Sequence, residues 1–239
     1  MKNLVIMLSL IFGAFSVCAQ SMETATHYNA WYTLSTSKKL NETWSIHGLG
    51  QVRRNQLVLH WQQSYLQLAL AKKITPKLSV AAGIGWVHFF PYGDFRAKYA
   101  FNEPRIWEEV AYNIKTEKWT IHQRLRWEHR FLERKYATSE GVYKFDEFMY
   151  KNRGRYRLLL KRPLKKFSLD VSNELFWDWG ENSFNHISQN RFIATIGKRL
   201  NKQLNGKVGY MYQTIWKGKE RDKIEHNHTL ILTFSIQLN

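Results

Sequence analysis

The sequence has 239 residues and a formal net charge of +17, with 36 Lys and Arg against 19 Asp and Glu. This length fits one β domain better than two domains. The positive charge suggests nucleic-acid binding, but the basic residues alternate with apolar ones instead of clustering, so we expect no nucleic-acid partner.

The first residues are typical of an export signal. Lys2 supplies a positive start, and the apolar run over residues 4–17 ends in a small-residue cleavage site. We therefore expect residues 1–19 to be a cleaved signal peptide and residues 20–239 to be the mature domain. Cleavage would remove Cys18, the only cysteine, so disulfides and cysteine nucleophiles are not expected.

From residue 28 onward, apolar and polar residues alternate along long segments. A β-strand sends successive side chains to opposite faces, so each segment has one apolar and one polar face. The segments are roughly 10–14 residues long, whereas the commonest globular strands have ~5–6 and ~9–11 tilted residues cross a bilayer. Charges interrupt every apolar run before it reaches the ~18 residues of a transmembrane helix. The expected strands are residues 28–36, 43–54, 61–72, 78–90, 104–115, 119–132, 147–162, 166–177, 189–200, 204–216 and 229–239.

The connections between these strands alternate between short and long. Residues 73–77 and 116–118 form short turns, whereas residues 55–60, 91–102 and 133–146 are longer and mostly polar. Short periplasmic turns and longer outer loops are the pattern of an outer-membrane barrel. We therefore expect an all-β fold, an antiparallel up-and-down transmembrane β-barrel of about 10–12 strands.

Eleven segments are recognised, whereas bacterial single-chain barrels have even numbers of strands. Either residues 28–36 lie outside the wall, or one strand is missing or divided, or the first and last strands pair in parallel. The alternative fold is a soluble sandwich or lipocalin-like barrel, which would bury the apolar face inward.

Two details of the apolar face carry further expectations. Gly83 and Gly85 share one face of their strand, which predicts a close approach of backbone or a bend. Tryptophans near strand ends would form the aromatic girdles of a membrane barrel. These are Trp44, Trp61, Trp119, Trp177 and Trp216.

The polar faces carry an unusual number of charges. In residues 119–132 the odd positions are mostly apolar, while the even positions include Arg124, Arg126, Glu128 and Arg130. In a membrane barrel these polar faces line the lumen. The predicted lumen charges are Arg53, Arg105, Glu109, Arg124, Arg126, Glu128, Arg130, Arg153, Arg155, Arg157, Asp170, Glu174 and Arg191.

These charges admit two interpretations. In the first, the acids and arginines pair across the lumen and fill it, because a buried charge is costly unless it is paired. In the second, the excess of arginine forms an anion-selective pore or a site for an anionic ligand. Cross-strand pairing of Asp170 and Glu174 with the arginines at 153–157 would favour the first.

The other candidate sites are weaker. His226 and His228 share a strand face, but a zinc site needs three or four ligands, so we expect the end of a loop at the membrane surface. Ser172 could act as a nucleophile with His122 or His47, but no nucleophile elbow accompanies it. We therefore expect no catalytic, cofactor-binding or metal-binding residues. Basic residues in the outer loops could meet lipopolysaccharide phosphates, although we favour a solvated role; they are Arg134, Lys135, Lys217, Lys219, Arg221 and Lys223.

Several short motifs occur in order along most of the mature chain. They are E-x-R-x-W from Glu103 to Trp107, R-x-R-x-E-x-R-F from Arg124 to Phe131, R-x-R-Y-R from Arg153 to Arg157, Asn190-Arg191-Phe192, Gln51-x-Arg53 and Gly209-Tyr210. In this order they resemble an uncharacterised family of Gram-negative outer-membrane β-barrels, a domain of unknown function known as the twenty-four-ninety family. The resemblance implies a barrel of unknown role and no catalytic residues. The final Asn239 departs from the terminal aromatic residue typical of many outer-membrane strands.

The expected function follows from the fold and the charges. We expect an outer-membrane protein that is structural or a narrow pore for small anionic solutes, without enzyme activity or cofactor. Its partners would be outer-membrane lipid, lipopolysaccharide and the outer-membrane assembly machinery, and it would be a monomer. The alternatives are an enzyme that modifies lipid or lipopolysaccharide and a soluble periplasmic ligand-binding barrel.

Overall fold

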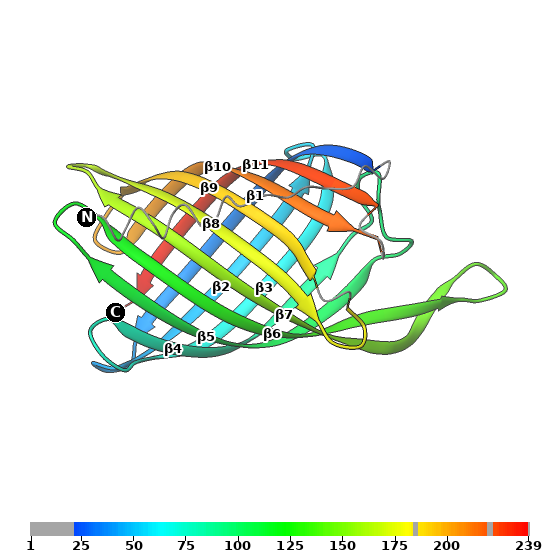
Figure 1. Cartoon of the computed structure of the whole chain (residues 1–239), viewed down its shortest axis with the longest axis horizontal. Coiled ribbons are helices and arrows are strands. Elements are labelled where there is room, and N and C mark those ends of the chain that lie inside the picture. Colours follow the sequence, from blue (N-terminus) through cyan, green and yellow to red (C-terminus); the bar gives the residue numbers. More distant parts are fainter. Residues whose placement is uncertain (1–21, 184–185, 219–221, 239) are drawn as a thin grey trace.

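The computed structural model describes residues 22–183, 186–218 and 222–238, and these form a closed barrel (Figure 1). The predicted signal peptide with Cys18 lies outside the described residues, as do Lys219, Arg221 and Asn239. No helix in the described ranges is long and apolar enough to cross a membrane. The strands are β1 (Glu23–Lys39), β2 (Trp44–Asn55), β3 (His60–Lys73), β4 (Leu78–Phe89), β5 (Phe101–Lys115), β6 (Thr120–Ala137), β7 (Tyr143–Pro163), β8 (Phe167–Trp179), β9 (His186–Arg199), β10 (Leu204–Lys217) and β11 (Lys223–Leu238).

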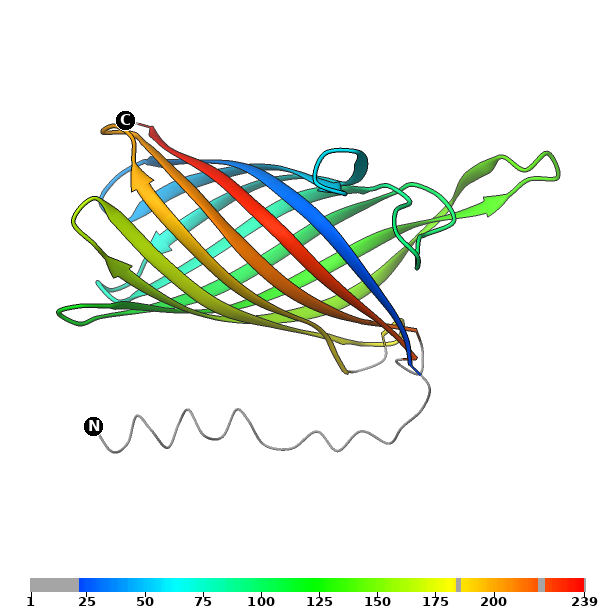
Figure 2. The same ribbon diagram turned by 90° about the horizontal axis from the view of Figure 1, so that it is seen from above.

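The barrel closes through a parallel pair of strands. Each strand pairs antiparallel with its neighbour in sequence, whereas β1 pairs with β11 in parallel, with Glu23 opposite Lys223 and Lys38 opposite Leu238 (Figure 2). Residues 28–36 therefore belong to the wall, and of the three alternatives for the odd number of segments the parallel pairing of the first and last strands is correct. An odd number of strands makes the parallel pair necessary, because the first and last strands then run in the same direction.

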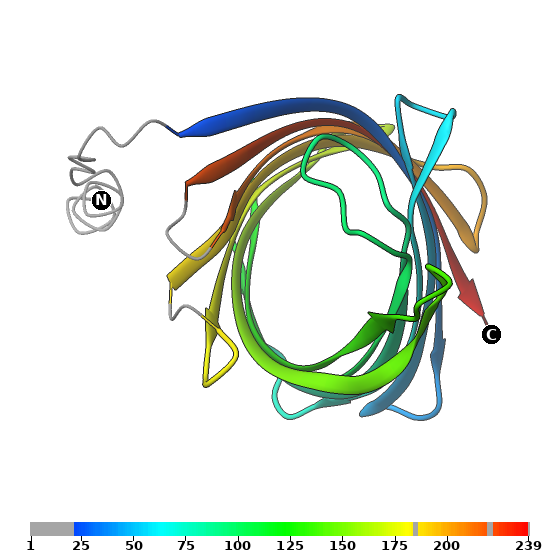
Figure 3. The same ribbon diagram turned by 90° about the vertical axis from the view of Figure 1, so that its right-hand side faces the viewer.

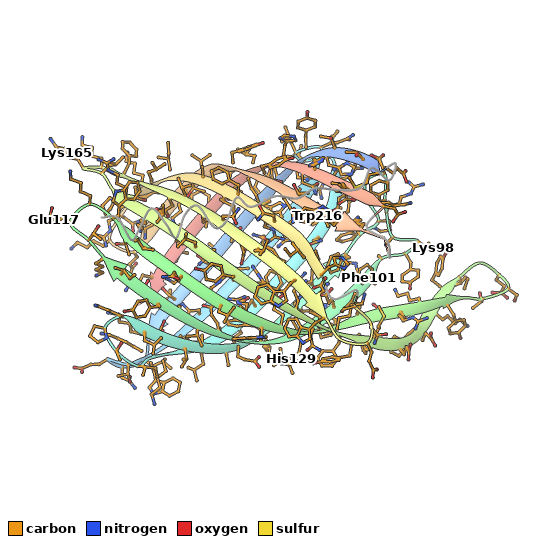
Figure 4. The ribbon with its side chains drawn as sticks, in the orientation of Figure 1. Lys98, Phe101, Glu117, His129, Lys165 and Trp216 are labelled. Atoms are coloured by element: carbon orange, nitrogen blue, oxygen red, sulfur yellow. The ribbon has the colours of Figure 1, made fainter. Side chains whose placement is uncertain are left out.

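The two ends of the barrel differ. Turns such as residues 40–43 and 116–119 connect strands at the short-turn end, where Glu117 and Lys165 lie (Figure 4). Longer connections lie at the opposite end, the long-loop end, marked by Lys98. The outer connection predicted at residues 55–60 is shorter in the structure and contains only residues 56–59. Gln56 and Leu57 reverse the chain there with φ of 49° and 64°.

The predicted outer loop at residues 133–146 is wrong. β6 and β7 continue as a hairpin to a turn closed by hydrogen bonds between Thr138 and Val142, and the hairpin projects beyond the barrel (Figures 1 and 2). Most side chains of residues 143–150 are exposed. Both faces of such a hairpin meet the same surroundings, so its sequence has no reason to alternate and the strand signal disappears.

The apolar faces point outward. The side chains that lie on the outer side of the wall by strand register are 48–66% exposed at Leu66, Ile84, Ile106 and Phe234. A soluble sandwich or lipocalin-like barrel requires the opposite arrangement, so the structure contradicts that alternative fold. An outer surface of this composition suits hydrocarbon better than water.

Candidate functional site

All thirteen predicted lumen residues point into the barrel. Strand register places them on the inward side of β2 and of β5 to β9, alternating with outward apolar residues. The alternation works because positions two apart in a strand share a face. Together with the inward Glu103, which the sequence argument missed, we call these residues the charge network.

Glu103 anchors the end of the network nearest the long loops. Its carboxylate is 0% exposed and accepts a hydrogen bond of 2.5 Å from Nε of Arg105. Arg130 binds it in a bidentate manner, at 2.7 Å from Nε and 2.8 Å from Nη2. Glu103 lies two residues before Arg105, so the face pattern could have found it. The predicted strand began one residue too late.

Glu128 is the centre of the network. It lies on β6 and is 1% exposed. Arg153 donates Nε and Nη2 to its Oε2 at 2.8 and 2.6 Å, and Arg155 donates Nη1 to its Oε1 at 2.6 Å. Both arginines come from β7, where Arg153 is directly opposite Glu128 and Arg155 is opposite Arg126. Two guanidinium groups therefore satisfy one buried carboxylate, the condition under which a buried ion pair is tolerated.

Glu109 and Glu174 hold the end of the network nearest the short turns. Arg126 contacts Oε2 of Glu109 through Nε at 2.8 Å and Nη2 at 2.7 Å. Glu174 accepts hydrogen bonds from Arg124 and from Nε and Nη2 of Arg155. Asp170 behaves differently from the expectation, because its partner is Lys207 of β10 at 2.5 Å and not an arginine of β7.

Arginine exceeds carboxylate in the network. Nine arginines surround Glu103, Glu109, Glu128 and Glu174, and three of the nine have no carboxylate within hydrogen-bond distance. Arg53 hydrogen-bonds Gln51 and Gln63 and lies 3.8 Å over the Trp31 ring. Arg191 lies 4.4 Å over Phe176, with its nearest carboxylate contact at 4.0 Å. No hydrogen bond or ion pair joins Arg157 to another described residue. The lumen therefore carries positive charge.

Side chains fill the middle of the lumen. The largest side chains that are less than 2% exposed all point inward by register. They are Trp107, Phe176, Met211, Glu103, Glu128, Glu225, Val87, Asn29, Asn227 and Thr229. Water would reach such groups if the barrel surrounded an open channel. The described conformation is closed at this level.

A segment between β4 and β5 folds into the mouth of the barrel at the long-loop end. Figure 3 looks at this end and shows residues 90–100, which we call the lid loop, folded inward over one side of the opening. Lys217 donates Nζ to the carbonyl of Phe95 at 3.3 Å, and Lys135 donates to the carbonyl of Ala100 at 2.8 Å. These two lysines therefore hold the lid loop, which differs from the solvated role expected for them.

Tyr92 of the lid loop is partly buried, and its ring centroid lies 6.2 Å from that of the inward-facing His27 of β1. Burial raises the pKa of its phenol, and the nearby Glu225 raises it further. The adjacent Gly93, with φ of +69°, brings the backbone so close to His27 that a Cβ there would lie 2.8 Å from the ring. Nothing in the alternation of the sequence marks this loop as a cover.

A cavity of about 540 Å³ opens at the short-turn end. We call it the vestibule. Small residues such as Ser37, Ala71 and Ser79 line its outer part, and Trp107, Glu109, Arg124 and Arg126 form its inner end. The charge network thus closes the lumen at the inner end of the vestibule. The vestibule itself is a positively charged recess that opens at the short-turn end.

The weaker candidate sites are not assembled into catalytic or metal centres. His226 and His228 face outward and pair with hydroxyls of Tyr212 and Tyr210 at 2.7 and 2.6 Å. No group of three His, Cys, Asp or Glu in the described residues is arranged to hold a metal ion. Ser172 and His122 both face the lumen, but no hydrogen bond between them occurs in the part of the chain that the structure describes.

The sequence matches one family model. This is the family described as "Protein of unknown function (DUF2490)", and the match covers residues 28–224. No curated protein matches the sequence.

Three solved structures are similar in barrel fold. The beta domain of the Bordetella autotransporter BrkA has 14% identity and a TM-score of 0.44, over 77% of this chain and 79% of that one. The NanC porin has 10% identity and a TM-score of 0.43, over 79% and 86%. A mutant of the ferric enterobactin receptor PfeA from Pseudomonas aeruginosa has 11% identity and a TM-score of 0.31, over 74% and 35%.

Proposed function

The chain belongs to the DUF2490 family, whose function is unknown, and from its lumen we propose a narrow, normally closed outer-membrane passage for small anionic solutes. In this proposal the protein is an exported monomer in contact with lipid and lipopolysaccharide, and the outer-membrane assembly machinery inserts it. We assign no reaction and no cofactor to the chain.

The outward apolar surface supports the membrane location. Closure of the barrel leaves no unpaired strand edge, which lipid would not tolerate. By analogy with known barrels, the short turns would face the periplasm and the long loops the outside. β11 follows a connection at the long-loop end, and β1 runs parallel to it. In this orientation both strands therefore start at the outer side of the membrane.

The excess of arginine is the observation that carries the preference for anions. Guanidinium groups that rest on glutamine or aromatic rings keep a net positive potential in the lumen, which attracts anions and repels cations. The packed centre and the lid loop explain why free diffusion would be blocked. A purely structural role is the second candidate, because the paired charges of Glu103 and Glu128 fill the barrel as firmly as an apolar core would.

Recordings across a planar bilayer distinguish these two roles. We expect the refolded wild type to remain closed for most of the time and to show small steps selective for chloride over potassium. Replacing Tyr92 and Trp107 by Ala should lengthen the openings, because both side chains obstruct the lumen. The matched control is Trp86→Ala, which removes a ring of the same size from the outer face.

Two results would overturn the passage. One is the absence of conductance in both the wild type and the Tyr92→Ala, Trp107→Ala variant, which would support the structural role. The other is a preference for cations in the open state, which the surplus of arginine cannot produce.

A further inference from the structure

We propose that the inner end of the vestibule binds the phosphate group of a small solute and prefers it to sulfate. This inference rests on the proposed function, since it names the anion and the side from which it enters. The chemistry is that of an oxyanion that still carries a proton, as inorganic phosphate does near neutral pH and a phosphate monoester, whose second pKa is about 6, does in more acidic solution.

The cationic part of this site is Arg124 with its neighbours. Arg124 is 8% exposed and lines the vestibule. One Nη of Arg124 is bound to Glu174, but its buried Nε has no hydrogen-bond partner and lies 3.5 Å from Oε2 of Glu109. Arg157 is opposite Arg124 on β7 and has no hydrogen bond within the described residues. Of these two residues Arg124 lines the vestibule, so its guanidinium group can make further charge-assisted hydrogen bonds to an anion there, while Arg157 adds positive charge from behind it.

Arg126 is positioned more rigidly. It binds Glu109 through two nitrogens and stacks 3.7 Å above the Trp107 ring. This fixes the floor of the recess, so the arginine charge is held in place before a ligand arrives. Such preorganisation lowers the entropy that binding would otherwise cost.

Two acceptors beside these donors account for the preference for phosphate. The Glu109 carboxylate lines the same inner end and can accept a hydrogen bond from a P–OH group. Nδ1 of His122 lies 2.7 Å from Oδ1 of Asn113, an oxygen that only accepts, so in the neutral ring Nδ1 carries the proton and Nε2 is an acceptor. Sulfate has no proton to donate at neutral pH. A sulfate oxygen would therefore face the Glu109 carboxylate as a second negative charge, with no hydrogen bond between the two.

The remaining wall suits a small substituent. Ser35, Ser37 and Ser79 offer hydroxyls, and Ala69, Ala71 and Ala111 leave space. The cavity of about 540 Å³ exceeds what a single phosphate needs, so a monoester of a small polyol would fit as well as the free ion. Inorganic phosphate and glycerol phosphate are therefore the two probes that distinguish a site for the free ion from a site for a monoester.

Calorimetric titration of the refolded protein in detergent tests the site without requiring conduction. We expect saturable binding of phosphate or glycerol phosphate and at least about tenfold weaker binding of sulfate, the loss expected for one hydrogen bond to a charged group. His122→Ala should weaken phosphate binding by a similar factor. Glu109→Gln should reduce the difference in affinity between phosphate and sulfate, because it removes the negative charge that repels sulfate.

The control for His122→Ala is His129→Ala, a change on the same strand at a position that faces outward. It should leave binding unchanged. Retention of heat-modifiable gel mobility shows that each variant is folded. Where Glu109→Gln fails to fold, a thiol placed by Ala111→Cys gives the second measurement. Its reaction with a polar thiol reagent should be slowed by phosphate and not by sulfate.

The outcomes separate this inference from the proposed function. Absence of saturable phosphate binding, equal affinity for sulfate, or equal effects of His122→Ala and His129→Ala would overturn the site, whatever the bilayer recordings show. Binding without conduction would overturn the passage and leave the site intact.

Discussion

The Trp107 ring occupies the space that a side chain at Gly83 would need. A Cβ built on Gly83 would lie 2.5 Å from Cζ2 of Trp107 and 2.5 Å from the carbonyl oxygen of Leu68. β4 and β5 bring the two residues directly opposite each other on the inward face. The absence of a side chain on one strand thus allows the large ring on the next to lie across the lumen beneath Arg126.

Gly83→Ala should destabilise the barrel by about 1–3 kcal/mol, because an added methyl must displace the ring or bend the strand. Urea unfolding in detergent or vesicles measures this change. The control is Gly50→Ala, where the nearest atom to an added Cβ is Cδ2 of Leu66 at 3.6 Å, an ordinary contact. Equal stability of the two variants would show that Trp107 does not lie against Gly83.

Glu128→Gln should destabilise the protein by about 3–5 kcal/mol, since it leaves two buried guanidinium groups without their shared carboxylate. The same substitution at Glu147, whose ion pair with Arg134 is more than half exposed, should cost less than about 1 kcal/mol. Comparing the two unfolding curves separates a general loss of charge from loss of the network. A small effect at Glu128 would mean that water reaches the centre of the barrel.

A disulfide can test the parallel closure. Leu34 and Phe234 are Cα partners on the outer face of β1 and β11. Replacing both with Cys should give a cross-link under mild oxidation, seen as a shift in gel mobility after unfolding. Leu34→Cys combined with Leu230→Cys should not react, because the second position is displaced by four residues, roughly 13 Å along the strand. Reaction of the second pair in place of the first would contradict the register.

Alkaline pH should loosen the lid loop. Burial favours the neutral phenol of Tyr92, so its contribution to closure is complete below the ordinary tyrosine pKa of about 10 and declines as the pH rises above it. We expect conductance to increase over this range. The informative comparison is with Tyr92→Phe, which should show a weaker increase because it has no phenol to ionise. Identical pH profiles of the wild type and the Tyr92→Phe variant would show that a group other than Tyr92 causes the alkaline response.

Alternation was sufficient to predict most of the wall and its faces. A period of two fixes the direction of each side chain once one face is known, and so the thirteen lumen residues could be named without a structure. The same rule places Glu103 with Arg105, and only the assigned strand boundary left it out. The outer composition also distinguishes a membrane barrel from a soluble one only when strand length is considered, since alternation alone fits both.

The features that alternation missed depend on relations between distant segments. The partners of β1 cannot be read from its own sequence, so the parallel closure stayed one of three alternatives. Tyr92 belongs to a loop with no periodicity, and its burial depends on Gly93 reaching His27 from β1. The pairing of Asp170 with Lys207 spans two strand boundaries, which adjacent-strand reasoning does not consider.

Single-channel recording in a salt gradient tests most directly whether paired charges with an excess of arginine close the lumen. The account predicts a wild type that stays near baseline and a Tyr92→Ala, Trp107→Ala variant that opens for longer, with a reversal potential on the side of the anion. A wild type that conducts steadily, or a variant that prefers cations, would contradict it.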